Sequence, residues 1–257
     1  MMQATLFQLD DYGPWTTTPA PRAEMDLQTL QSRVYADVAS FVGSRDGYAF
    51  YARGDNLLAF TSGIDRGAHE TLQSTIRNRY PVTLSAGIGT GSTPRSAVED
   101  ATDRLQAAGS AQDSTRTEAC RGTALAAADP FHVAHFDVVD ATATYTDETG
   151  AYDSFLAMTS TFEAVSRTLY EHHGLAFFVG GDNVLALCPL LAESTYDGVI
   201  DEARARAGVD LRVGVGQGVT PATAGMDAKR ALEVGRESDR ATVFADGATA
   251  PPADAAD

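Results

Sequence analysis

Apolar and polar residues follow a regular order of spacings in the first half of the chain. Strict alternation predicts a half-buried strand, whereas apolar positions that recur every three or four residues predict a helix packed on one side. These patterns give strand, helix, two strands around a Gly-Asp-Asn turn, helix, strand and helix. The predicted elements lie at residues 5–9, 24–42, 48–51, 57–60, 65–79, 82–86 and 95–108.

The second half repeats the same order of elements. Its strands and helices are predicted at residues 133–136, 151–173, 176–179, 184–187, 193–206, 211–215 and 222–237, with an additional edge strand at 241–244. The agreement between the halves indicates two similar modules in one chain.

A constant spacing links individual residues of the two halves. Asp10 and Asp55 recur 127 positions later as Asp137 and Asp182. The same spacing relates the glycine-rich runs 87–91 and 214–218, and the residue pairs Asn56/Asn183, Gly54/Gly181, Gly47/Gly174 and Pro94/Pro221. Self-similarity over half of the chain indicates tandem domains rather than a solenoid.

The order βαββαβ is that of the ferredoxin-like arrangement, in which the first and third strands are antiparallel neighbours. We therefore predict an α+β fold of two tandem ferredoxin-like domains, each an antiparallel sheet with helices on one face. The domains are expected at residues 1–108 and 131–244, joined by a connecting segment with a short helix at 109–130. Residues 245–257 contain only Ala, Pro, Gly, Asp and Thr, and we expect a disordered tail there.

The charge balance is strongly acidic. The 257 residues include 19 Lys and Arg against 35 Asp and Glu, which gives a net charge of −16, and Lys229 is the only lysine. Such a surface disfavours nucleic acid, whose binding depends on clustered basic residues. It is typical of adaptation to a salty cytoplasm, because salt screens the repulsion among the carboxylates.

The sequence lacks the motifs of membrane proteins, secreted proteins, disulfide-rich proteins and zinc proteins. The chain has no apolar stretch of transmembrane length and no signal-peptide pattern, so we expect no membrane partner and a cytoplasmic location. Cys120 and Cys188 lie far apart without a CxxC motif, which signals neither a disulfide framework nor a zinc site.

Four aspartates are the main candidates for chemistry. In the predicted sheet, Asp10 at the end of the first strand approaches Asp55 in the turn before the third, and Asp137 approaches Asp182 in the same way. Two carboxylates so placed suit Mg²⁺, which is bound by one or two carboxylates together with water and substrate phosphates. The alternative is that Gly-Asp-Asn serves only as hairpin-turn chemistry. The pairing with a strand-end aspartate in both halves favours the metal.

The glycine-rich runs have two interpretations. Each follows a strand and precedes a helix, as phosphate-binding loops do, but neither has the Lys-Ser/Thr of a P-loop. We therefore predict that these glycines allow close packing of the strand against the helix.

Longer sequence motifs carry a family resemblance. Phe136-Asp137 and Gly180-Gly181-Asp182-Asn183 resemble the strand end and hairpin of the palm domains of class III nucleotide cyclases and GGDEF diguanylate cyclases. The motifs at residues 10–15, 26–37, 76–81 and 109–113 resemble archaeal GTP cyclohydrolase III, and the similarity extends from about residue 2 to 244.

This resemblance implies two tandem palm domains and a Mg²⁺-dependent, zinc-free enzyme that opens the imidazole ring of GTP and hydrolyses two phosphoanhydride bonds. The implied product is 2-amino-5-formylamino-6-(5-phosphoribosylamino)pyrimidin-4(3H)-one, used for flavin and deazaflavin cofactors. A monovalent cation such as K⁺ is a second candidate cofactor, and we expect a homo-oligomer.

The resemblance also suggests roles for single residues. The candidate catalytic and metal-binding residues are Asp137, Asp182, Asp10 and Asp55, with Asp140 as a further ligand or a solvated loop acid. The candidate substrate-binding residues are Gly180, Gly181, Asn183, Asn56, Tyr12, Trp15, Arg77 and Arg79.

Some of these assignments have structural alternatives. Tyr12 and Trp15 could stack on guanine or pack on the core, and Arg77 and Arg79 could bind phosphate or cap a helix C-terminus. His132 and His135 are expected to share one face of their strand, with metal binding, packing or proton transfer as their possible roles.

Two further functions remain open. A palm-type nucleotide cyclase is disfavoured because Asn183-Val184 replaces the Glu-Phe that would follow in a GGDEF enzyme. A non-catalytic GTP-binding sensor is disfavoured because both aspartate pairs are retained.

Overall fold

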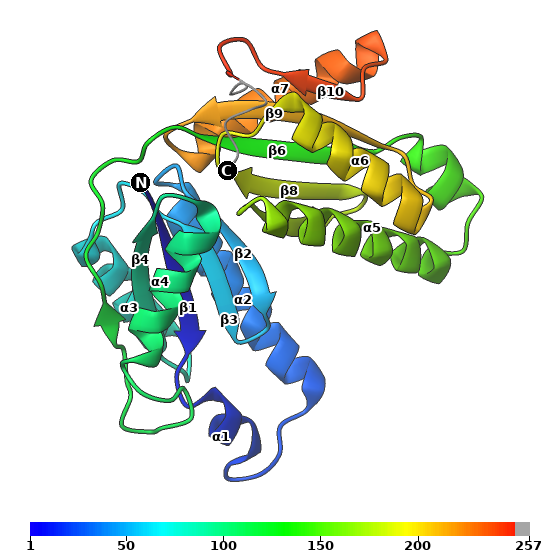
Figure 1. The fold of residues 1–257 in the computed structure, drawn as a ribbon. Helices are drawn as coiled ribbons and strands as arrows, with labels where there is room; N and C mark the ends of the chain where they lie inside the picture. The colour runs from blue at the N-terminus through cyan, green and yellow to red at the C-terminus, as the bar shows by residue number, and fades with distance from the viewer. Residues whose placement is uncertain (250–257) are drawn as a thin grey trace. The chain divides into compact units, whose positions relative to one another are not determined.

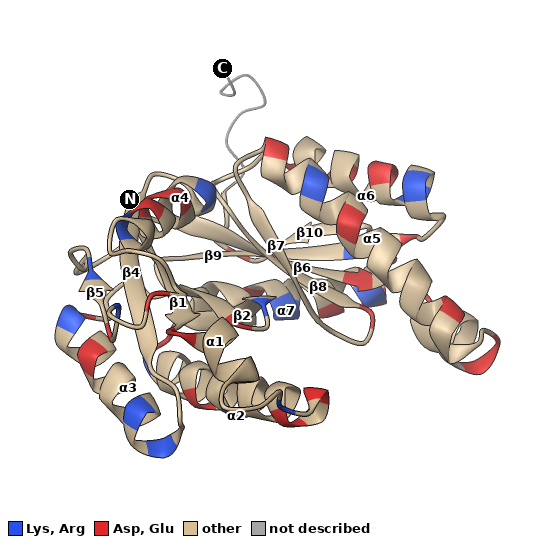
Figure 2. Cartoon of the chain, turned by 90° about the horizontal axis from the view of Figure 1, so that it is seen from below, with Lys and Arg blue, Asp and Glu red and all other residues tan. Residues whose placement is uncertain are grey.

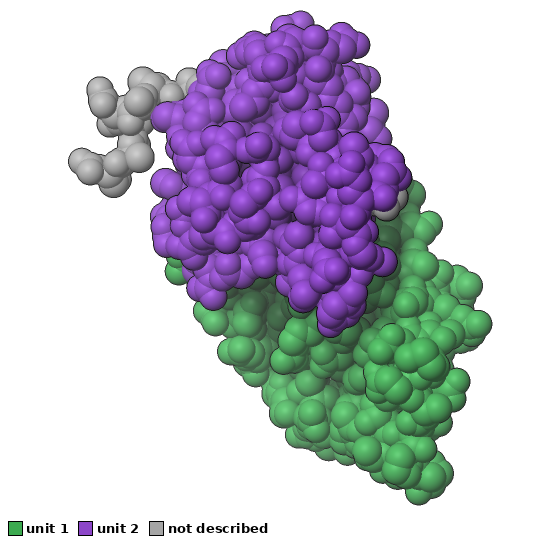
Figure 3. Space-filling model, turned by 90° about the vertical axis from the view of Figure 1, so that its right-hand side faces the viewer, with its two compact units in different colours: residues 1–129 green, residues 130–257 purple. Residues whose placement is uncertain are grey.

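The computed structural model describes residues 1–249, which form two compact units: Met1–Asp129 (unit 1) and the residues from Pro130 onward (unit 2) (Figure 3). Within the described part, no helix is long and apolar enough to cross a membrane. Most acidic and basic residues lie on helices and loops, and the strands are largely uncharged (Figure 2).

Unit 1 is a five-stranded sheet of order β2-β3-β1-β4-β5 with helices on both sides (Figure 1). Its elements are β1 (Met2–Leu9), α1 (Tyr12–Thr17), α2 (Glu24–Gly43), β2 (Tyr48–Arg53), β3 (Asn56–Phe60), α3 (Arg66–Arg79), β4 (Leu84–Gly91), α4 (Pro94–Gln106) and β5 (Cys120–Arg121). The predicted central pairing is confirmed, because β1 lies antiparallel between β3 and β4.

Unit 2 has the equivalent order β10-β9-β6-β8-β7. Its elements are β6 (Phe131–Val138), the π-helix η1 (Thr142–Asp147), α5 (Ala151–Glu171), β7 (Leu175–Gly180), β8 (Asn183–Cys188), α6 (Glu193–Ala207), β9 (Leu211–Gly218), α7 (Pro221–Ser238) and β10 (Thr242–Phe244). The predicted edge strand is present as β10, which runs parallel to β9. The prediction of a mixed α+β fold with two similar sheets is confirmed.

Two helices of each unit share one face of the sheet, as predicted, and a third helix covers the other face. In unit 1 the core between the sheet and helices α2 and α3 contains Phe7 and Ile88. Gly87 and Gly89, which alternate with Ile88 on β4, face α4 instead. Helix α4 begins where Thr93 accepts a hydrogen bond from Ser96, with Pro94 in the first turn.

The packing role of the glycine-rich runs is confirmed. A Cβ atom at Gly89 would lie 2.1 Å from the backbone nitrogen of Ala101, and one at Gly216 would lie 2.1 Å from the carbonyl oxygen of Ala224. The strand and helix backbones are therefore in contact in both units, and no room is left for a phosphate.

Replacing Gly89 by alanine is expected to lower the free energy of unfolding of unit 1 by about 3 kcal/mol, because strand and helix must separate to admit the methyl group. Gly43→Ala is the matched control, since nothing lies within 4 Å of its Cβ position. Denaturant unfolding followed by the fluorescence of the single tryptophan, Trp15, measures both variants. Equal stability of the two variants would contradict the packing argument.

The segment between the predicted domains differs from expectation. Residues 109–129 contain no helix and belong to unit 1, where they supply the parallel edge strand β5. The start of the predicted disordered tail is also ordered, because Ala245 donates a hydrogen bond to Val215 and Thr249 donates one to the Gln217 side chain. Residues 250–257 of that tail lie outside the described residues.

The first strands break the 127-residue spacing. The second, third and fourth strands of the two units start 127 positions apart, but β1 (Met2–Leu9) and β6 (Phe131–Val138) are 129 positions apart. In the sheets, Gln8 lies opposite Asn56, whereas Asp137 lies opposite Asn183. The expectation that Asp10 and Asp137 occupy equivalent places is therefore wrong: Gln8 stands where Asp137 does. A two-residue shift preserves the side-chain faces and is invisible to hydrophobic patterning.

Candidate functional site

Three predicted acids meet in one pocket of unit 2. Asp137 lies at the end of β6, Asp140 follows in a left-handed conformation (φ 53°), and Asp182 lies in the β7–β8 turn. These carboxylates line an open pocket of ≈ 420 Å³ together with Arg212 and Arg236. The pocket has the size of a small-molecule site and contains charges of both signs.

Asp137 is neutralised by an arginine that sequence patterns did not identify. The Arg236 side chain on α7 donates to Asp137 Oδ1 at 2.7 Å and to Oδ2 at 3.3 Å. The hydrogen bond to Asp137 raises the pKa of Arg236. Arg236 is half-exposed and Asp137 is buried, so the guanidinium can turn towards the pocket while the carboxylate stays in place. The 99 positions between the two residues explain why no local motif revealed the pair.

The turn that carries Asp182 has an open backbone. Gly180 (φ 109°) and Gly181 (φ 61°) both require conformations that favour glycine, and nothing lies within 4 Å of the Cβ position of Gly180. Asn183 donates from Nδ2 to Asp182 Oδ1 at 2.8 Å, and the Asn183 carbonyl lies 2.9 Å from His135 Nε2. The predicted residues Gly180, Gly181 and Asn183 therefore flank Asp182 in the turn, but they do not line the pocket itself.

Asp10, the strand-end aspartate of unit 1, is not the structural equivalent of Asp137 and has a different environment. Asp10 is 4% exposed and accepts five hydrogen bonds, from Thr83, Ser85, the backbone of Glu118 and two nitrogens of Arg116. A carboxylate with this many donors is held by the protein itself. The predicted role of Asp10 as a metal ligand gains no support from this environment.

The unit 1 turn is also less accessible. The Gln31 side chain lies 2.6 Å from the Cβ position of Gly54, so it covers the tip that is open at Gly181. Asp55 is partly buried, 3.7 Å from Arg53, and accepts a hydrogen bond from Asn56 at 3.2 Å. Asp55 and Asn56 are therefore adjacent as predicted, but unit 1 has the neutral Gln8 in the place of Asp137.

Tyr12 and Trp15, the predicted guanine-stacking residues, pack within unit 1. Tyr12 and Trp15 stack on each other with centroids 5.9 Å apart and pack against the core. Arg22 covers the Trp15 ring at 4.0 Å, and Gln31 donates to the Tyr12 hydroxyl. Burial raises the pKa of Tyr12. These contacts agree with the packing alternative.

Arg77 and Arg79 are engaged by acids at the end of α3. Arg77 donates to Glu118 at 2.5 Å and Arg79 donates to Asp37 at 2.7 Å, and Tyr80 also donates to Asp37. Their charges are therefore paired with carboxylates within unit 1.

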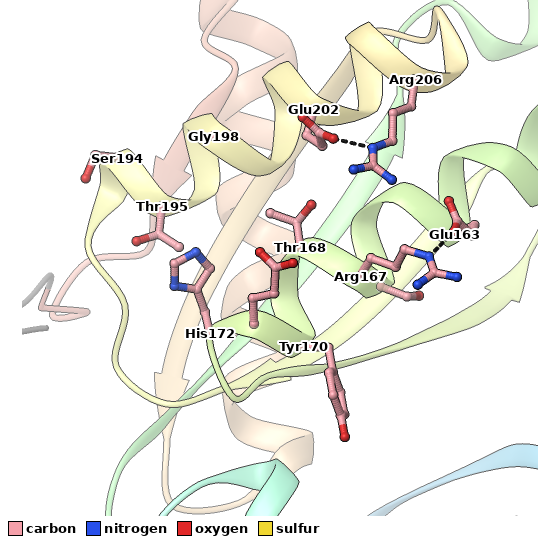
Figure 4. A pocket seen from close by; sticks show the side chains of 12 residues that line it. Glu163, Arg167, Thr168, Tyr170, His172, Ser194, Thr195, Gly198, Glu202 and Arg206 are labelled. Carbon is pink, nitrogen blue, oxygen red and sulfur yellow. Dashed lines mark hydrogen bonds and ion pairs between the residues drawn. The ribbon is translucent and has the colours of Figure 1, made fainter. Parts of the chain in front are cut away.

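A larger hollow lies between α5 and α6, on the far side of the unit 2 sheet from α7 (Figure 4). Its arginines are paired on their own helices, Arg167 with Glu163 and Arg206 with Glu202. None of the predicted acids lines this hollow, and its cations are already neutralised. The acidic pocket rather than the larger hollow therefore contains the predicted acids and is the candidate site.

The two histidines of β6 do not share a face, because three positions separate them and a strand alternates with a period of two. His132 is buried against Tyr196 on α6, and its Nδ1 lies 3.2 Å from the backbone nitrogen of Leu191. His135 faces the opposite side and contacts Asn183. Burial lowers the pKa of His132 to about 4 and also lowers the pKa of His135.

The lowered pKa of His132 predicts acid sensitivity of unit 2. Its contribution to stability is complete above the unfolded-state pKa of 6.5 and is lost as the pH falls towards 4. Between pH 7 and pH 5 the loss should amount to about 2 kcal/mol. Denaturant unfolding followed by circular dichroism should show this loss in the wild type and a smaller one in His132→Asn, whose carbonyl can still accept from Leu191. An equal loss in both proteins would contradict the assignment.

The strand order, with one acid at the end of the first strand and a second in the turn before the third, defines unit 2 as a palm-like domain and the chain as a tandem pair of such domains. The chain belongs to the GTP cyclohydrolase III family, whose model matches residues 1–246.

Relatives match nearly the whole chain. GTP cyclohydrolase III 1 of Halobacterium salinarum is 52% identical over 92% of this chain and 95% of its own length. GTP cyclohydrolase III of Methanocaldococcus jannaschii is 40% identical over 93% of this chain and 88% of its own length. Among solved structures, a GGDEF domain from Pseudomonas aeruginosa is 18% identical and covers 46% of this chain and 83% of its own, with a TM-score of 0.42.

Proposed function

We propose that this protein is a Mg²⁺-dependent GTP cyclohydrolase that opens the imidazole ring of GTP, retains the formyl group and releases two phosphates, and that its metal site lies in unit 2. The observation that carries the location is the pocket in which Asp137, Asp140 and Asp182 meet Arg212 and Arg236. The reaction rests on the family match across residues 1–246.

The pocket residues fit Mg²⁺ better than a metal held entirely by protein. Among residues 1–249, no three His, Cys, Asp or Glu side chains are close enough to hold an ion alone. Mg²⁺ requires only one or two carboxylates when substrate phosphates and water supply the remaining oxygens. Asp137 and Asp182 would hold it, and the bound ion would neutralise charge on the phosphates.

The remaining pocket groups would bind the triphosphate. Arg236 would leave Asp137 and turn towards a phosphate, since a guanidinium binds phosphate in the same forked geometry as a carboxylate. Arg212 adds a second cation at the wall of the pocket. The open backbone at Gly180 and Gly181 permits close approach of phosphate oxygens, which side chains would prevent.

The proposed reaction consumes three water molecules. One adds to C8 of guanine and the C8–N9 bond breaks, which leaves the formyl group on N7 and a proton on N9. The other two cleave the two phosphoanhydride bonds, so a ribonucleotide monophosphate and two phosphates result. The ring nitrogens and phosphates accept or release the protons, and no redox cofactor is needed.

The reaction is tested by incubating the full chain with GTP and MgCl₂ in molar KCl, and in NaCl to assess a role of K⁺. A formamidopyrimidine monophosphate with two equivalents of phosphate supports the proposal. A cyclic nucleotide with pyrophosphate would indicate a cyclase, and tight GTP binding without turnover would indicate a sensor. Either of these outcomes overturns the proposed reaction. Size-exclusion chromatography with light scattering tests the expected homo-oligomer.

A further inference from the structure

A chain of three side chains ends at the proposed metal ligand Asp182. His135 Nε2 lies 2.9 Å from Asn183 Oδ1, and Asn183 Nδ2 lies 2.8 Å from Asp182 Oδ1. The ionised carboxylate can only accept, so the Asn183 amide presents its nitrogen to Asp182 and its oxygen to His135. The imidazole must therefore carry a proton on Nε2. Because Asp182 can only accept, Asn183 donates to Asp182 and His135 donates to Asn183.

Unit 1 contains the same turn without this support. Asn56 donates to Asp55 at the longer distance of 3.2 Å, and the buried Oδ1 of Asn56 has no hydrogen-bond partner among the described residues. The strand register explains the difference. Leu6 lies opposite Leu58 and Gly87 in unit 1, as His135 lies opposite Leu185 and Gly214 in unit 2.

The equivalent position is thus a leucine in one unit and a histidine in the other. A leucine cannot donate a hydrogen bond, and the amide of Asn56 is left with an unpaired acceptor. A buried acceptor without a donor costs about 1–3 kcal/mol. In unit 2, His135 donates to Asn183 and removes that cost. The hydrogen-bond donor His135 and the strand-end acid Asp137 therefore occur in the same unit.

We propose that His135 is a positioning residue of the metal site: by fixing the amide of Asn183, it holds Asp182 with Oδ1 occupied and Oδ2 available to a cation. This inference rests on the proposed function, because it requires Asp182 to be a ligand. The space beside the Cβ position of Gly180 is open, so no side chain packs on that side of the turn. Residues that form hydrogen bonds to a metal ligand orient it, and their replacement typically lowers metal affinity about 10- to 100-fold.

The test measures binding of Mn²⁺, a paramagnetic substitute for Mg²⁺, by electron paramagnetic resonance on the full-length protein saturated with a GTP analogue that has a methylene group in place of the β–γ bridging oxygen. The analogue is needed because Arg236 occupies Asp137 when no phosphate is bound. His135→Phe should weaken binding by about 10- to 100-fold. His135→Gln should restore most of the affinity, because its amide nitrogen can donate to Asn183. Asn183→Leu should behave as His135→Phe does. Asn56→Leu, the matched change in unit 1, should leave the affinity unchanged.

Kinetics separate positioning from direct ligation. Turnover of GTP by His135→Phe should require more Mg²⁺ but regain a near wild-type kcat at saturating Mg²⁺. Unchanged Mn²⁺ affinity in His135→Phe, or failure of His135→Gln to restore it while circular dichroism shows both folded, overturns the inference. Asp182→Asn distinguishes the two proposals. If it binds Mn²⁺ normally, the proposed site fails; if it loses Mn²⁺ while His135→Phe does not, only the positioning role fails.

Discussion

Replacing Asp182 by asparagine should lower kcat/KM for GTP by about 10²- to 10³-fold, whereas Asp55→Asn should change it less than about threefold. Both changes are isosteric and remove one negative charge from equivalent turns. In unit 2 that charge lies in a pocket with Asp137 and two arginines. In unit 1 the position equivalent to Asp137, opposite Asn56 on the first strand, is the neutral Gln8. Asp55 therefore lacks the second carboxylate that Asp182 has.

The comparison is made with purified variants at saturating Mg²⁺ in molar KCl, and circular dichroism confirms that each is folded. Loss of activity in Asp55→Asn alone would transfer the metal site to unit 1. Unchanged activity in both variants would exclude the metal model for either turn. Asp137→Asn should resemble Asp182→Asn in activity, since it removes the other proposed ligand.

Replacing Arg116 by methionine should lower the stability of unit 1 by about 3–5 kcal/mol. Both members of this ion pair are almost fully buried, with side chains 3% and 2% exposed for Arg116 and Asp10. Methionine has a similar length but leaves the carboxylate without its cation in a site that water cannot reach. Arg116 also donates to Gln8 and to the carbonyl of Gly109, so the segment that follows α4 would lose its attachment.

Denaturant unfolding followed by Trp15 fluorescence measures this effect within unit 1. Arg66→Met is the control, because Arg66 pairs with Glu70 on the surface of α3, where such pairs contribute about 0.3–0.5 kcal/mol. The double variant with Asp10→Asn should recover part of the loss, since the buried charge is then absent. A small effect of Arg116→Met would show that Asp10 is not held by the pair and would reopen its candidacy as a metal ligand.

The sequence predicted most of the architecture because the relevant signals are local. Alternation identified the strands, helical spacing identified the helices, and the glycine-rich runs indicated close strand-to-helix packing, which the backbone contacts at Gly89 and Gly216 confirm. Elements without a periodic signal were missed, among them α1, η1 and β5. These elements are held by contacts made in the folded chain: α1 and η1 pack on the cores of their units, and β5 pairs with β4.

The candidate site was predicted less completely. Asp137, Asp140 and Asp182 were identified, and the structure brings them to one pocket. Arg236 was not identified, because its partner Asp137 is remote in sequence. An arginine in the last turn of a helix such as α7 is common and does not by itself indicate a functional site. Arg116, which pairs with Asp10 in unit 1, comes from the loop after α4 rather than from a helix, so the internal repeat did not indicate either arginine.

The duplication, the order of elements and the acids at strand ends and in turns could be predicted from the sequence, because each depends on neighbours within a few residues or on direct repetition. The two-residue shift between β1 and β6, which places Gln8 rather than Asp10 where Asp137 stands, becomes visible only in the folded chain. A shift by two keeps every side chain on its original face, so hydrophobic burial is satisfied equally in both registers. Cross-strand pairing and the ion pairs of Arg116 with Asp10 and of Arg236 with Asp137 distinguish the registers, and these contacts exist only in the folded chain.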